Sequence, residues 1–136
     1  MRSFFQKLYS GKLLPVAWTF LTIVLLCLPG SSFAGGEVMF EIPGFDKYVH
    51  IILFGCIVLF WGIHYAFRLK GVPGWRKVVI LLAILSTGLG IVLEFVQLYC
   101  IPDRSFDGFD IVADATGASV AALFLLFVYP GSKMRS

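Results

Sequence analysis

The sequence predicts an all-α, polytopic membrane protein that folds as a four-transmembrane-helix bundle. Of its 136 residues, 59% are hydrophobic, whereas apolar residues make up roughly 45–50% of an ordinary soluble domain. A run of about 17–25 apolar residues is long enough to cross a bilayer as a helix. The predicted spans are 13–29, 48–69, 78–100 and 111–129. The sequence contains no internal repeat or low-complexity tract that would indicate a second domain.

The first span, 13–29, also has the pattern of a signal peptide. The basic segment MRSFFQKLYSGK precedes the apolar run, and the small residues of SSFAGG offer a cleavage position after Ala34. Cleavage there would leave three transmembrane helices. We favour a retained helix, because the apolar run is long for the hydrophobic region of a signal peptide.

The distribution of charged residues predicts how the four spans are oriented in the membrane and which segments are loops. Nine of the eleven basic residues fall on one side if four helices alternate in direction, and only Lys47 and Arg104 fall on the other. The positive-inside rule therefore predicts that both termini are cytoplasmic. The cytoplasmic segments are 1–12, 70–77 and 130–136, and the outer loops are 30–47 and 101–110. Because the basic residues act as orientation signals, we predict no nucleic-acid partner.

The second span opens with a polar motif, GFDKYVHIILFG. Asp46 and His50 are four residues apart and Lys47 and His50 are three apart, so a helix that starts near Asp46 places them on one side. Asp46 is also a candidate N-cap. One interpretation is a cap and a histidine at the level of the lipid headgroups. The other is a histidine held by a carboxylate, which would act as an acid, a base or a ligand.

The third span carries a carboxylate at membrane depth, in IVLEFVQLYCIPD. Glu94 and Gln97 share a helix face, and Gly90 lies one turn further in. At ~1.5 Å per residue, Glu94 lies about 9 Å inside the end of the span at Cys100. An ionised side chain that faced lipid there would be costly, so Glu94 should face the bundle interior. It then serves either a functional site or a hydrogen-bonded latch between helices.

The last span begins with three aspartates at helical spacing, Asp107, Asp110 and Asp114, in RSFDGFDIVADATGA. Asp107 or Asp110 can cap the helix and complement its positive end. Asp114 lies about one turn inside and needs a partner. The candidate partners are Arg104, His50 and Lys47. Small residues extend a similar face inward and predict close packing against another helix; they are Gly117, Ala118 and Ala121.

These three motifs resemble the VanZ-like family of membrane proteins. The similarity is carried by DKYVH, LEFVQ and RSFDGFDIVADATGA, and it extends over 45–127. It implies a compact multi-helix protein of the bacterial envelope, in the inner (cytoplasmic) membrane. The family's namesake lowers susceptibility to the glycopeptide teicoplanin, but the resemblance supplies no biochemical activity.

The residues that match the family pattern are Asp46, Lys47, His50, Glu94, Gln97, Arg104, Asp110 and Gly117. One position departs from it: Asp114 stands where the family usually has asparagine in its D-x-x-x-N-x-x-G element. A carboxylate changes the charge of the site and provides a position for a cation or a proton.

Three classes of function remain open from the sequence. In an enzyme, Glu94 and His50 would exchange protons with a lipid-linked or cell-wall precursor at the outer leaflet. In a non-catalytic binding or assembly factor, the polar residues would only recognise such a molecule. A proton- or ion-linked transporter is a third class, although no broken-helix pair is evident. The binding residues would be Asp46, Lys47, Gln97, Arg104, Asp110 and Asp114.

The sequence predicts no cofactor, and the lipid bilayer is the one partner that composition alone predicts. No tight metal-ligand spacing is present. An alternative interpretation places a hard divalent cation among Glu94, Asp110 and Asp114, whose oxygens suit such an ion.

Overall fold

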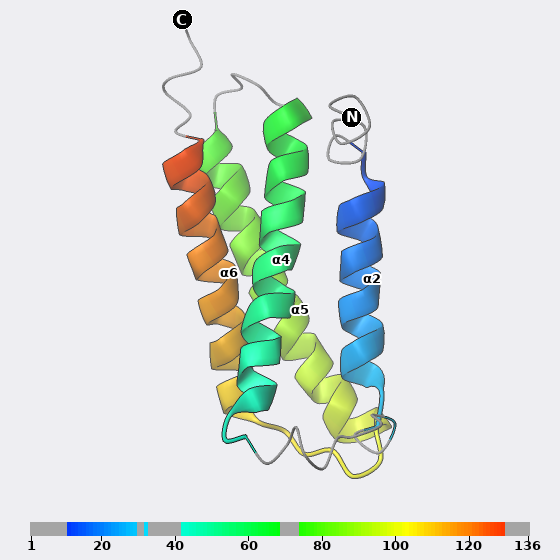
Figure 1. Cartoon of the computed structure of the whole chain (residues 1–136). Coiled ribbons are helices and arrows are strands. Elements are labelled where there is room, and N and C mark those ends of the chain that lie inside the picture. Colours follow the sequence, from blue (N-terminus) through cyan, green and yellow to red (C-terminus); the bar gives the residue numbers. More distant parts are fainter. Residues whose placement is uncertain (1–10, 30–31, 33–41, 69–73, 130–136) are drawn as a thin grey trace, which may run out of the picture.

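The computed structural model describes residues 11–29, 32, 42–68 and 74–129. These residues form four α-helices and no strand: α2 (Leu13–Cys27), α4 (Phe45–Arg68), α5 (Trp75–Cys100) and α6 (Gly108–Val128). Successive helices run in opposite directions and form an elongated bundle (Figure 1). The most extensive packing is between α4 and α6, and α5 packs on both of them. The predicted all-helical fold is therefore confirmed for this part of the chain.

Three of the helices are long and apolar enough to cross a membrane: α4, over Phe45–Ala66, and the whole of α5 and α6. The shorter α2 has 15 residues and extends for only about 22 Å at ~1.5 Å per residue. It ends at Cys27, and Leu28 is extended, with φ −77° and ψ 140°. Proline disfavours helical geometry in the residue before it, so Pro29 explains why this helix is shorter than the predicted span 13–29.

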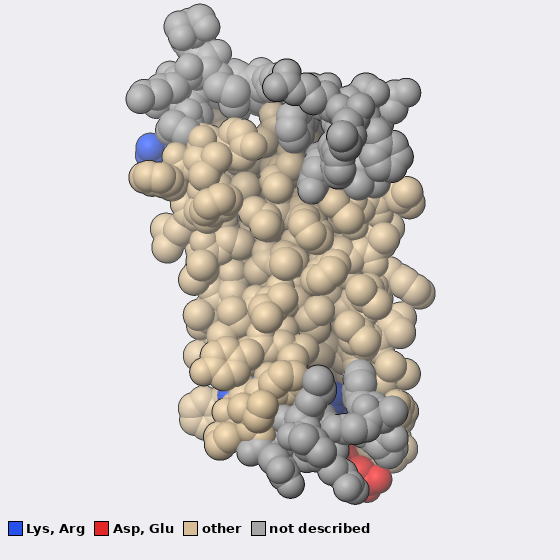
Figure 2. All heavy atoms as spheres, in the orientation of Figure 1, with Lys and Arg blue, Asp and Glu red and all other residues tan. Residues whose placement is uncertain are grey.

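The bundle is apolar outside and along most of its core, and its buried charged side chains gather at one end. Large hydrophobic side chains point outward along all four helices; for example, Phe20 is 68% exposed, Ile84 62% and Phe127 86%. Figure 2 shows the middle of one face without a charged side chain, between ends that carry them. Glu94 and Asp114, by contrast, are buried. A surface of this kind is suited to lipid rather than water, and it indicates a membrane protein.

The three long helices each begin three residues before the predicted span. They start at Phe45, Trp75 and Gly108, where the sequence pattern predicted 48, 78 and 111. The added first turns of α4 and α6 carry charged residues. The predicted spans omitted them because those spans were located as apolar runs. As a result Asp46 lies within the first turn of α4, so its predicted role as N-cap is wrong.

Small residues allow α4 and α6 to approach closely. A Cβ built on Gly117 would overlap the main chain of Ile51, and one built on Gly55 would lie 3.2 Å from the carbonyl oxygen of Gly117. Ala118 is fully buried beside this crossing. The predicted small-residue face of the last helix is thus confirmed, and it brings the first turns of α4 and α6 together.

Hydrogen bonds tie α2 to the other helices. The indole Nε1 of Trp18 donates to the carbonyl oxygen of Leu53 (3.1 Å), and that of Trp61 donates to the hydroxyl of Thr19 (3.1 Å). Apolar residues of α2, α4 and α5 share one buried cluster: Leu26, Leu53, Phe54, Ile57 and Leu93. The first helix is therefore an integral part of the packed bundle.

Candidate functional site

Polar side chains gather at the end of the bundle where α4 and α6 begin and α5 ends. We call this group the polar cluster: Asp46, Lys47, His50, Glu94, Asp107, Asp110 and Asp114. Its members come from the first turns of α4, from the last two turns of α5, and from the N-cap and first two turns of α6. The helix crossing at Gly117 thus places side chains that are about 60 residues apart in the sequence within hydrogen-bonding distance.

Lys47 holds the exposed side of the cluster together. Its Nζ donates to Asp46 (2.8 Å), Asp107 (2.7 Å) and Asp110 (2.7 Å), so all three donors of the ammonium group are used. The hydrogen bond from Lys47 lowers the pKa of the Asp107 carboxyl, and the bond from the Phe109 amide lowers it further. Lys47 is therefore saturated by the protein's own carboxylates.

Asp107 connects α6 to both neighbouring helices. Its side chain caps α6 by accepting from the main-chain N–H of Phe109 (2.8 Å), which confirms the predicted cap. Its own main-chain N–H donates to Oε2 of Glu94 on α5 (3.0 Å). The helix start is consequently fixed through one residue to Lys47 on α4 and to Glu94 on α5.

His50 lies deeper and faces two carboxylates. Its Nδ1 is 2.8 Å from Oδ1 of Asp114, and its Nε2 is 3.7 Å from Oδ2 of Asp110. His50 is 4% exposed and Asp114 is fully buried. Asp114 fits because the residue opposite is Gly90, where any Cβ would collide with the Asp114 carboxyl group. Of the three candidate partners for Asp114, the structure selects His50.

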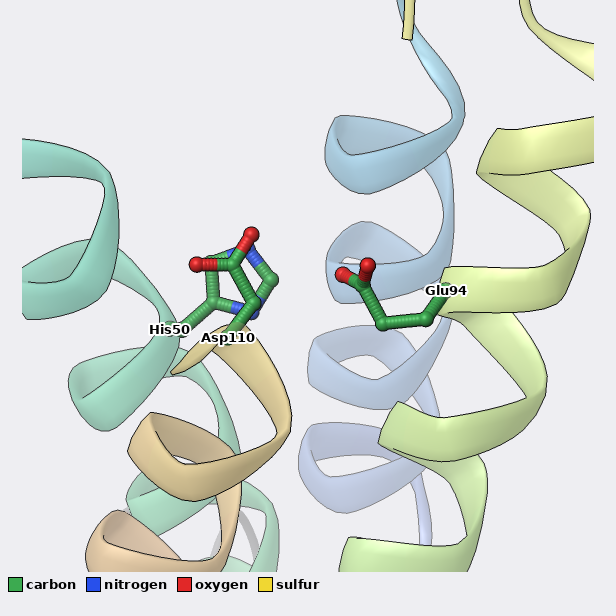
Figure 3. Close-up of side chains that lie close together, drawn as sticks. All are labelled: His50, Glu94 and Asp110. Atoms are coloured by element: carbon green, nitrogen blue, oxygen red, sulfur yellow. The ribbon is translucent and has the colours of Figure 1, made fainter. Parts of the chain in front are cut away.

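Glu94 points from α5 toward His50 and Asp110, which project from the facing helices α4 and α6 (Figure 3). It is 1% exposed. Oε2 accepts the hydrogen bond from Asp107, whereas Oε1 is buried and has no hydrogen-bond partner among the described residues. A buried carboxylate oxygen without a donor is unfavourable. Among the described residues, the cluster has two such oxygens, Oε1 of Glu94 and Oδ2 of Asp114, and each calls for a proton or a ligand.

Two of the predicted site residues lie apart from the cluster's hydrogen bonds. Gln97 donates through Nε2 to the carbonyl oxygen of Leu26 (2.8 Å) and so fastens α5 to α2. Arg104 makes no ion pair within the described part of the chain, and its Nε is buried without a hydrogen bond. Asp107, conversely, belongs to the cluster but was predicted only as a cap. Its three-residue spacing to Asp110 was the available signal.

The geometry also changes the alternative metal site. Ligand atoms of His50, Glu94 and Asp110 all lie within 4.8 Å of one another, whereas Asp114 is not a member of this group. Asp114 instead lies behind the imidazole, on its Nδ1 side. A second group, of Asp46, Asp107 and Asp110, is the one whose carboxylates bind Lys47.

Comparisons with protein-family models, curated proteins and solved structures found no match to this chain.

Proposed function

We propose that the chain is a VanZ-like integral membrane protein of the bacterial envelope that acts on a lipid-linked or cell-wall precursor. Its polar cluster would lie at the outer leaflet of the cytoplasmic membrane, with both termini in the cytoplasm. The distribution of lysine and arginine supports this orientation. Antibiotic susceptibility, to teicoplanin among others, would then depend on the cluster.

The observation that carries the proposal is a His50–Asp114 pair at 2.8 Å beside Oε1 of Glu94, which has no hydrogen-bond partner in the described part of the chain. A carboxylate that accepts from Nδ1–H fixes the tautomer of a histidine and leaves Nε2 able to take up a proton. Nε2 and Glu94 Oε1 would serve as the acid–base groups. Arg104, whose Nε lacks a partner in the described part of the chain, would hold a phosphate or carboxylate of the substrate.

A non-catalytic role in binding or assembly is the second candidate, and the burial of the cluster favours it. His50, Glu94 and Asp114 are each at most 4% exposed, so the side chains that would react are covered in this conformation. In a binding factor, the cluster would fix the shape of a recognition surface. Glu94→Gln and Asp114→Asn would then retain most of the function, because each amide has the size and hydrogen-bonding capacity of the acid it replaces.

The test is complementation of a deletion strain, scored on a panel of envelope-active antibiotics that includes teicoplanin. For an enzyme, Glu94→Gln and His50→Ala should both abolish complementation at an unchanged protein level. Asp103→Asn is the matched control, because this carboxylate lies in the loop between α5 and α6 and is not a member of the cluster. Full complementation by both cluster variants would refute the enzyme. Retention by Glu94→Gln and Asp114→Asn, with loss in His50→Ala, would favour the binding factor.

We also propose that α2 is a retained fourth span. Its support is the packing of α2, including the hydrogen bond from Gln97 to its last turn, since removal of α2 would leave that buried amide without its acceptor. The intact mass of the purified protein tests this directly. A chain that begins at Gly35 would refute the four-span bundle.

A further inference from the structure

The polar cluster contains two groups of converging ligands that share Asp110, and among the described residues Lys47 lies within the outer group. The carboxylates of Asp46, Asp107 and Asp110 surround the ammonium of Lys47 at 2.7–2.8 Å. The deeper group consists of His50, Glu94 and Asp110, with ligand atoms within 4.8 Å of one another. No lysine or arginine among the described residues pairs with Glu94. This deeper group therefore has the composition of a site for an external cation.

The imidazole of His50 is oriented as a metal ligand requires. Metal-binding histidines commonly donate their second ring N–H to a carboxylate, which fixes the tautomer and the ring plane. Asp114 is placed to accept such a bond from Nδ1 at 2.8 Å, so the lone pair of Nε2 points to the opposite side. That side faces Asp110 and Glu94 (Figure 3).

The distances suit a shared ion better than a direct hydrogen bond. Nε2 of His50 and Oδ2 of Asp110 are 3.7 Å apart, which is too long for a hydrogen bond. Two ligands on one Zn²⁺ ion, at bonds of ~2.0–2.2 Å and tetrahedral angles, lie about 3.4 Å apart. A small inward movement of either side chain would therefore bring these two atoms to the spacing of two ligands on one ion.

Glu94 provides the independent observation that points to a ligand. Its Oε1 is buried without a hydrogen-bond partner in the described residues, while Oε2 is held by the N–H of Asp107. The carboxylate is thus anchored by one oxygen, and the Glu94 side chain points toward His50 and Asp110 (Figure 3). A buried carboxyl group is stable when it is protonated or when a counter-charge lies beside it. A divalent ion would supply that charge to Glu94 and Asp110 together.

We propose that Nε2 of His50, Oε1 of Glu94 and Oδ2 of Asp110 bind one first-row divalent metal ion, such as Zn²⁺ or Mn²⁺. One imidazole with two carboxylates suits these ions, whereas Mg²⁺ and Ca²⁺ prefer oxygen ligands alone. Asp114 is a positioning residue that orients His50. Three protein ligands leave coordination positions for water or substrate, as in catalytic sites. The metal site would make His50 a ligand instead of a proton carrier, but it does not rest on the proposed function.

The test is metal binding by the full chain, purified in detergent, stripped with a chelator and equilibrated with Zn²⁺ alone or Mn²⁺ alone. After gel filtration, we expect about one ion per chain in the unaltered protein and in the control Asp103→Asn. Glu94→Gln and Asp110→Asn should weaken binding at least tenfold. Asp114→Asn should weaken it by about 10–100-fold, as loss of a carboxylate behind a histidine ligand commonly does.

Far-ultraviolet circular dichroism and the elution volume establish that each variant is folded, so that a loss of binding reflects the ligands. Failure of the unaltered protein to retain either ion, or unchanged affinity in both folded Glu94→Gln and Asp110→Asn, would overturn the metal site. These measurements need no substrate. Metal binding at the expected ligands in a protein whose Glu94→Gln variant complements fully would support the site and overturn only the proposed enzyme.

Discussion

Replacing Gly117 with alanine should force α4 and α6 apart at the level of the polar cluster. The added Cβ would lie 2.9 Å from both the carbonyl carbon and the Cα of Ile51, and closer still to the carbonyl oxygen. These are main-chain atoms within a helix, so they cannot rotate away as a side chain can. The only relief is a displacement of one helix relative to the other.

The size of the effect follows from these distances. Carbon atoms pack best at about 3.5–4.0 Å, so the two carbon contacts alone require the helices to separate locally by roughly 0.6–1.1 Å, and the closer carbonyl oxygen requires at least as much. Overpacking of this kind costs about 1–3 kcal/mol, and the better helix propensity of alanine returns at most ~1 kcal/mol. We expect a net loss of about 1–2 kcal/mol. Because His50 precedes Ile51 and Asp114 is one turn from Gly117, their 2.8 Å hydrogen bond should also lengthen.

The assay is equilibrium unfolding in mixed detergent micelles, with circular dichroism as the signal that monitors the loss of helix. Gly88→Ala is the matched control, because it makes the same change in α5 where a Cβ would meet no atom within 4 Å. It should be neutral or slightly stabilising. If Gly117→Ala proves as stable as Gly88→Ala, the close crossing of α4 and α6 is refuted.

Three further substitutions should weaken the folded state in the same unfolding assay. Lys47→Met leaves three carboxylates without their ammonium group. Since the lysine side chain is 31% exposed, we expect the free energy of unfolding to fall by roughly 1–3 kcal/mol. Lys77→Met is the control, and an equal fall in that variant would contradict the ion-pair network. Gln97→Leu leaves the carbonyl oxygen of Leu26 in α2 without its donor and should lower the free energy of unfolding by about 1–3 kcal/mol. Unchanged stability would contradict the packing of α2 on the bundle. Gly90→Ala should destabilise the protein because its Cβ would lie 2.9 Å from Cγ of Asp114. Adding Asp114→Ala to this variant should recover part of the lost stability. If the double variant instead loses the sum of the two single losses, the contact is contradicted.

The fold was largely predictable because lipid selects for a simple property, a long apolar run. That property located α4, α5 and α6, but it missed the polar first turns that carry Asp46 and Asp110. It also overestimated the first helix, which Pro29 shortens. Whether α2 packs on the bundle was not predictable from hydropathy, since a signal peptide and a short buried helix have the same composition.

The site was predictable within each helix and not between helices. The spacing of Asp110, Asp114 and Gly117 correctly placed them along one face of α6. Pairing across helices depends on crossing position and rotation, so His50 was only one of three candidate partners for Asp114. Gln97 shows the same limit, because it lies one turn from Glu94 yet contacts a different helix. Over one turn of α5, the contact therefore changes from the start of α6 at Glu94 to α2 at Gln97.

Asp110 divides its two carboxylate oxygens between Lys47 and His50. Oδ1 accepts from Lys47 near the end of the bundle, and Oδ2 faces the buried His50. Charge at one position therefore alters the affinity of the other, and thermodynamic linkage makes this effect reciprocal. An anionic headgroup that drew Lys47 toward the bilayer surface would leave Asp110 more strongly attractive to a cation beside the histidine. The Lys47–Asp110 ion pair would thereby couple the charge at the surface of the bundle to cation binding at the buried histidine.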